Sequence, residues 1–109
     1  MSELDVPVDL DKTLRALSHA TRRAILHLAA HRSIPATELA QELHISPATA
    51  SEHLRVLRKT GLVVLEASGT WRRYRANAAR IGVALNTLSE DLRPITEPFQ
   101  PITHPKEPP

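Results

Sequence analysis

The side chains of this chain that are best suited to molecular recognition lie between Ser46 and Tyr74, and their chemistry is hydrogen bonding and charge neutralisation. Ser46 can accept a backbone N–H at a helix start, and Pro47 fits the first helical position. Apolar residues then recur at helical spacing, which leaves hydroxyl, carboxylate, imidazole and guanidinium groups on the opposite face. Such groups can bind base edges and phosphates in a DNA major groove, although a solvated helix face has a similar composition. The candidate DNA-binding residues of this helix are Ser46, Thr49, Ser51, Glu52, His53, Arg55 and Arg58.

A basic hairpin is predicted directly after this helix. Residues 62–66 are β-branched and apolar enough for a strand, residues 68–70 form a turn, and residues 71–75 return with Arg72 and Arg73 near the tip. Residues 51–80 contain seven Lys or Arg and two Glu, whereas residues 1–11 contain four acidic residues and no basic one. The chain has eleven arginines and three lysines, and a planar guanidinium suits phosphate and guanine better than a point charge does. This clustering predicts double-stranded DNA as the partner, with Arg72 and Arg73 as further contacts.

Two histidines have the spacing of metal ligands. His27 and His31 are four residues apart in a helix predicted over residues 21–31, so they could share a nickel or zinc ion. Further ligands would have to come from elsewhere, such as Asp5, Asp9, His19 or a second subunit. Two histidines on a solvated helix face need have no such role. The chain has no cysteine, which excludes disulfides and thiolate metal sites.

Composition excludes several classes of protein. At 109 residues and a net charge of +2, the chain fits one domain with a modest core. It has no long apolar run and an acidic N-terminus, so a secretory or membrane protein is not expected and the predicted location is the cytoplasm. No Ser-His-Asp set, carboxylate pair or Gly-rich phosphate loop stands out, so an enzyme is not expected.

The remaining elements are predicted to be helices around one core. An amphipathic helix begins near Asp9 and ends near Ser18, and residues 36–43 form a short helix that is joined by a turn to the one at Ser46. Gly61 closes that helix, and a last helix with one apolar face is stopped by Pro94. The fold class is therefore mainly α with a small β-hairpin. We expect an acidic arm over residues 1–8, the domain over residues 9–93 and a disordered proline-rich tail over residues 94–109.

Three segments together resemble the ArsR-type winged helix-turn-helix regulators of bacteria. They are ALSHATRRAIL, ATELAQELHISPATASEHLRVLRKTGLV and the hairpin SGTWRRYR, and the resemblance runs from about Leu14 to Asn77. It implies four helices, a two-stranded wing and a fifth helix, and a homodimer that represses transcription from an operator with two half-sites. It also implies that the first and last helices form the dimer interface, where the candidate residues are Leu10, Leu14, Leu17, Leu85 and Leu88.

The sequence departs from the family in ways that affect its signal and its operator. Glu52 stands where the family often has glutamine, which exchanges a donor for an acceptor. The third-helix segment has no thiol and the fifth helix has no histidine, so neither familiar metal site can form. An accessory sensor protein is therefore a possible partner. The alternative function is a winged-helix module that binds another protein instead of DNA.

Overall fold

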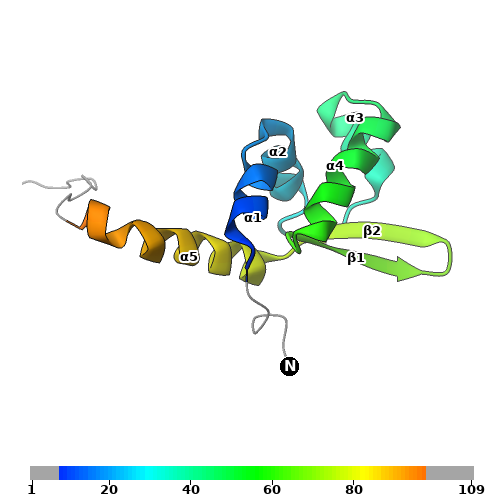
Figure 1. Cartoon of the computed structure of the whole chain (residues 1–109). Helices are drawn as coiled ribbons and strands as arrows, with labels where there is room; N and C mark the ends of the chain where they lie inside the picture. Colours follow the sequence, from blue (N-terminus) through cyan, green and yellow to red (C-terminus); the bar gives the residue numbers. More distant parts are fainter. Residues whose placement is uncertain (1–7, 98–109) are drawn as a thin grey trace, which may run out of the picture.

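The computed structural model describes residues 8–97, which form five helices and a two-stranded antiparallel hairpin. Helix α5 extends from one side of a helical body and the hairpin extends from the other (Figure 1). The fold is mainly α with a small β-hairpin, as predicted. The elements are α1 (Leu10–Leu17), α2 (Ala20–Leu28), α3 (Ala36–Leu43), α4 (Pro47–Lys59), β1 (Val63–Ser68), β2 (Trp71–Ala76) and α5 (Ala78–Thr96).

Local side-chain caps explain where four of the helices begin. Asp9, His19, Ser46 and Asn77 precede α1, α2, α4 and α5, and each side chain accepts a backbone N–H from the first turn. Such a bond satisfies one of the N–H groups that the helix itself cannot pair. The sequence therefore encodes these starts locally, and the predicted starts at Asp9 and Ser46 are confirmed.

The core is aliphatic and is shared by all elements near the centre of the body. Helices α1, α2, α3 and α4 each contribute at least one residue that is almost fully inaccessible to solvent, and β1 adds Val63. The chain has only one Trp, one Tyr and one Phe, so leucine, isoleucine, alanine and valine fill the core. The core cluster consists of Ala16, Ile25, Leu26, Ala29, Ile34, Leu39, Leu54, Leu57, Leu62 and Val63.

Backbone hydrogen bonds attach the hairpin to the body. In the ladder Leu65 pairs with Tyr74 and Ser68 with Trp71, which leaves a two-residue turn that begins with Gly69 at φ +62°. On the outer edge of β2, the N–H and C=O groups of Tyr74 bond those of Ile34, both at 2.9 Å. The hairpin is thus fixed relative to the helices near its base, while its tip projects.

Two predicted helix ends are wrong. Helix α2 ends at Leu28 instead of residue 31, because the Ala29 carbonyl accepts the Ala76 N–H at 2.9 Å and the chain must turn toward β2. Helix α5 continues through Pro94 to Thr96. The proline removes one hydrogen bond only, in the last turn of an exposed helix, and the Glu97 N–H still bonds the Arg93 carbonyl at 2.9 Å.

Most of the two predicted terminal segments lies outside the described residues. This applies to residues 1–7 of the acidic arm and to the tail from residue 98 onward. Among residues 8–97, no helix combines the length and the apolar character needed to cross a bilayer.

Candidate DNA interface

Helix α4 is anchored along one side and open along the other. Its buried residues are Ala50, His53, Leu54 and Leu57, which recur every three or four positions and face the helical body. The remaining positions form a polar and basic surface. The candidate contacts Ser46, Thr49, Ser51, Glu52, Arg55 and Arg58 are all exposed, as a binding role requires.

Four of these exposed residues bond one another in two pairs. The Ser46 hydroxyl accepts the Thr49 N–H at 3.0 Å and lies 2.9 Å from the Thr49 hydroxyl, so its first role is to cap α4. Arg55 donates to the Glu52 carboxylate at 3.2 Å. Both ends of this ion pair are more than 60% exposed, so it adds little stability and can exchange for contacts to bases or phosphates.

His53 is not on the exposed face, and its predicted orientation toward DNA is wrong. It is 9% exposed, and its Nδ1 accepts a hydrogen bond from Arg22 Nε at 3.2 Å. Arg22 is half-buried at this contact. The sequence held a signal for this position, because His53 follows Ala50 by three residues and precedes Leu57 by four, within the buried stripe.

A basic hollow separates α4 from β2. It has a volume of about 370 Å³ and is lined by Ser51, Arg55, Arg58, Lys59 and Tyr74. Three cations and two hydroxyl groups line this space, a combination suited to a phosphate oxygen. Lys59 and Tyr74 were not among the sequence candidates. Tyr74 could have been predicted from its place on the strand that returns toward the basic end of α4.

The hairpin cations are not equivalent. Arg72 is exposed, whereas the Arg73 guanidinium lies over the Trp71 ring with its carbon 4.1 Å from the ring centroid and is half-buried. Arg72 is therefore free to reach a groove, while Arg73 is held by a cation–π contact. Trp71 is itself 55% exposed at the start of β2 and was not predicted to take part.

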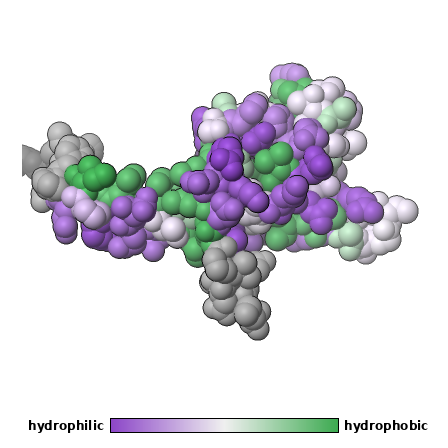
Figure 2. Space-filling model, in the orientation of Figure 1, coloured by the Kyte–Doolittle hydropathy of each residue, from purple (hydrophilic) through white to green (hydrophobic). Residues whose placement is uncertain are grey.

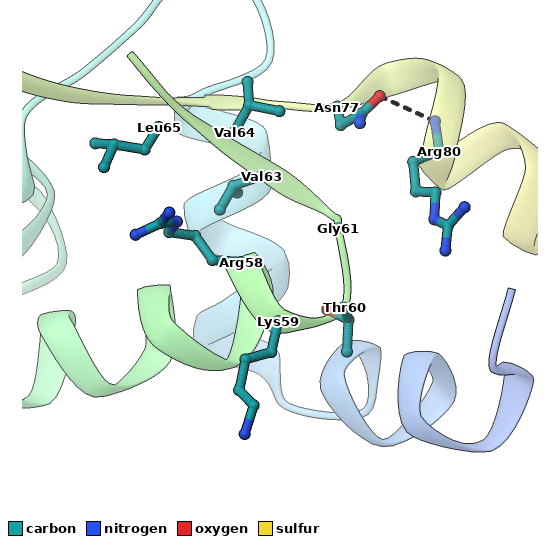
Figure 3. A pocket seen from close by; sticks show the side chains of 9 residues that line it. All are labelled: Arg58, Lys59, Thr60, Gly61, Val63, Val64, Leu65, Asn77 and Arg80. Atoms are coloured by element: carbon teal, nitrogen blue, oxygen red, sulfur yellow. Dashed lines mark hydrogen bonds between the residues drawn. The ribbon is translucent and has the colours of Figure 1, made fainter. Parts of the chain in front are cut away.

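A second hollow lies where α4, β1 and α5 meet. It has a volume of about 440 Å³, and Figure 3 shows Arg58 and Lys59 at the end of α4 and Arg80 in the first turn of α5 around it. Arg58 and Lys59 thus line both hollows. The basic surface predicted for residues 51–80 is continuous along the end of α4.

Comparison with known proteins identifies this architecture. The family model described as a helix-turn-helix domain matches residues 17–66. An ArsR-like transcriptional regulator from Rhodococcus sp. RHA1 has a similar structure, with a TM-score of 0.67 and 30% sequence identity over 84% of this chain and 92% of that one. The chain belongs to the ArsR-type winged helix-turn-helix family.

Two further proteins are similar to this chain. The HTH-type transcriptional regulator Rv2034 of Mycobacterium tuberculosis is 40% identical over 65 residues, which are 60% of this chain and 61% of that regulator's length. The homodimeric winged helix-turn-helix DNA-binding domain of Mb0332 from Mycobacterium bovis has the same fold, with a TM-score of 0.62 and 24% identity over 84% of this chain and 86% of that one. Membership of this family places the chain among regulators rather than enzymes, as the sequence predicted.

This ArsR-type chain has an apolar groove between α1, α2 and α5. The groove has a volume of about 730 Å³, and three of the predicted dimer residues line it, namely Leu14, Leu17 and Leu85. Leu10 and Leu88 are half-buried and lie beyond its lining. Figure 2 shows hydrophobic surface along α5 and at its junction with the body. Leu85 is 56% exposed, an unfavourable state for a large apolar side chain.

The predicted metal pair does not lie on one helix. His27 is in the last turn of α2, whereas His31 follows the end of that helix, and both border the apolar groove. The spacing of four residues therefore does not place them one turn apart. Within residues 8–97, no three His, Cys, Asp or Glu side chains come close enough together to hold a metal ion.

Proposed function

We propose that this protein is a cytoplasmic transcriptional repressor that binds, as a homodimer, an operator with two half-sites. The observation that carries the proposal is the polar and basic surface formed by the exposed face of α4 and the hollow between α4 and Tyr74, with Arg72 exposed on the same strand as Tyr74. This surface belongs to a fold whose relatives include transcriptional regulators.

In this proposal α4 is the recognition helix and enters the major groove. Thr49, Ser51 and Glu52 lie near its N-terminal end, where hydroxyl and carboxylate groups can contact base edges. Arg55, Arg58 and Lys59 follow on the same exposed surface and neutralise backbone phosphates. Arg72 lies on the projecting hairpin and reaches the adjacent minor groove, where narrow A·T-rich stretches attract cations.

The apolar groove supports the dimer. Leu14 and Leu17 from α1 and Leu85 from α5 would be covered by the same residues of a second copy, because a two-fold interface uses one surface twice. Burial of a leucine side chain contributes about 1.5–3 kcal/mol, so a few such residues from each copy give a substantial driving force. A dimer also presents two recognition helices, which is what two half-sites need.

Titration of DNA binding tests this proposal. The purified protein is titrated against a duplex from its own promoter region and a random duplex of equal length, at two salt concentrations, with fluorescence anisotropy as readout. We expect a preference for the promoter of about 10³-fold or more. Equal, weak binding to both duplexes would contradict operator recognition and would favour a module that binds another protein.

A matched pair of variants tests the basic surface. Arg72→Ala should weaken binding to every duplex. Because one phosphate contact is lost, the negative slope of log affinity against log salt concentration should become less steep by about 0.9. Lys12→Ala removes an exposed cation from α1, away from α4, and should leave the slope unchanged. Equal slopes for wild type and Arg72→Ala would exclude Arg72 from the interface.

A further inference from the structure

A cluster of three nitrogen-rich side chains connects α4 to α2. His53 Nδ1 accepts from Arg22 Nε at 3.2 Å, and the His53 ring meets the His19 ring edge-on with centroids 4.6 Å apart. Both partners come from the beginning of α2, where His19 is the N-cap. His53 is 9% exposed, which makes it one of two polar residues that the body buries among residues 8–97.

The hydrogen bonds determine the state of both rings. Because Arg22 can only donate, His53 Nδ1 must carry a lone pair, so the proton of the neutral ring is on Nε2. His19 Nδ1 likewise accepts the Thr21 N–H at 3.3 Å. A proton added to His53 Nδ1 would point at the Arg22 N–H and would break this hydrogen bond.

Arg22 also contacts α1. Its Nη1 lies 3.4 Å from the Arg15 carbonyl in the last turn of α1. One guanidinium therefore joins the end of α1 to the middle of α4. Because α4 carries Ser51 and Glu52 on its other face, any shift of the helix at His53 also moves these side chains.

The charges around His53 oppose its protonation. Burial is the largest cause of a lowered His53 pKa, and the charges of His19 and Arg22 add to it, while Glu52 on the same helix acts in the opposite sense. The neutral ring is therefore the form that the folded body accommodates. Protonation puts a second positive charge beside Arg22 at a buried position, where a charge interaction is little screened.

We propose that Arg22 and His53 position the recognition helix, and that protonation of His53 releases this link and lowers the affinity of the protein for its operator. Arg22 belongs to α2 and His53 lies on the buried face of α4, so both are positioning residues. The effect on affinity depends on the proposed function, whereas the link between His53 and the placement of α4 does not.

The first experiment uses the full chain without DNA. Side-chain ¹⁵N spectra of the histidines, recorded as the pH is lowered, report the tautomer and the titration of His53, and backbone spectra report the amides of α4. We expect a neutral His53 with its proton on Nε2, and shifts of the α4 amides that follow the His53 titration. Protonation on Nδ1 in the neutral form, or α4 amides that stay unchanged as His53 titrates, would overturn the proposal.

The second experiment measures operator affinity from about pH 7.5 to about pH 5.5. Wild-type affinity should fall several-fold over this range, with most of the fall at its acidic end, because the pKa of His53 lies below its ordinary value. In His53→Asn the amide oxygen stands near the position of Nδ1 and can accept from Arg22 without titrating, so this fall should disappear. His44→Asn is the matched control, because His44 is an exposed residue at φ +55°, a conformation that asparagine tolerates, and its pH profile should match wild type.

Further variants and outcomes keep the test decisive. Arg22→Met serves as a second variant in case His53→Asn fails to fold. It removes the hydrogen-bond donor and its positive charge, so the titration of His53 should move to higher pH. The same pH profile for wild type and a folded His53→Asn variant would overturn the proposal. If wild type binds no DNA at any pH, the proposed function fails, and the spectra of the free protein alone then decide whether His53 controls the placement of α4.

Discussion

Replacement of Gly61 by alanine should perturb the joint between α4 and the β1–β2 hairpin. The helix ends in a Schellman motif, with the Gly61 N–H bonded to the Arg58 carbonyl at 3.0 Å and the Leu62 N–H bonded to the Leu57 carbonyl at 2.9 Å. Gly61 has φ +77°, which costs a residue with a Cβ about 1–2 kcal/mol. The added Cβ would also lie 3.3 Å from Arg80 Nε, so the Arg80 side chain must move by a few tenths of an ångström.

The reduced freedom of the unfolded chain offsets part of this cost, by about 0.4–1 kcal/mol. Gly61→Ala should therefore lower the free energy of unfolding by about 1 kcal/mol, and the thermal midpoint by about 4–8 °C, at fixed protein concentration. Urea unfolding measures the change. Gly69→Ala is the matched control, because Gly69 also has positive φ, at +62°, but a Cβ there would meet no atom within 4 Å.

We expect Gly61→Ala to be more destabilising than Gly69→Ala, since only the former must displace Arg80. Gly61→Asn should lie between wild type and Gly61→Ala, because asparagine tolerates positive φ but keeps the Cβ contact. A Gly61→Ala variant as stable as wild type would refute the reasoning from backbone conformation. Equal losses for the two alanine variants would refute the contribution of Arg80.

Three other predictions address the cap, the dimer and the pH dependence. Ser46→Ala should lower the free energy of unfolding by about 1 kcal/mol, because the side chain that caps α4 is lost. Ser46→Asp keeps the cap and the stability, but its carboxylate should weaken DNA binding. Urea unfolding and fluorescence anisotropy check the two effects, and equal stability of the two variants would contradict the cap. Leu85→Glu should abolish the dimer in sedimentation without unfolding the protein, because Leu85 is 56% exposed in one copy; a dimer that survives would place the interface elsewhere. Burial lowers the His53 pKa from its ordinary 6.5, so the unfolded chain binds more protons than the folded chain below that pH. The free energy of unfolding should therefore fall as the pH drops below about 6.5, and it should fall less in His53→Asn. The same dependence of unfolding free energy on pH in both proteins would exclude His53 as the cause.

The local elements could be predicted from the sequence because their signals lie within a few residues. The caps at Asp9 and Ser46, the apolar stripe of α4 and the Gly-containing turn of the hairpin each involve neighbours along the chain. The order of these elements indicated a mainly α fold with a small β-hairpin, and the resemblance of three segments to ArsR-type regulators implied the winged helix-turn-helix arrangement. Arg72 and the polar side of α4 were found because exposed polar positions need only the helical or strand period to be recognised.

Only the tertiary structure decided which groups meet across the body. Arg22 and His53 are 31 positions apart in the sequence, and the donor that turns the imidazole inward comes from another helix. Helix α2 ends at Leu28 because Ala29 bonds Ala76 in the distant strand β2, a contact that no local pattern in α2 contains. Local propensities are decided by neighbouring residues, whereas burial and the hydrogen-bond partners of Arg22, His53 and Ala29 depend on surfaces that exist only when the elements pack together.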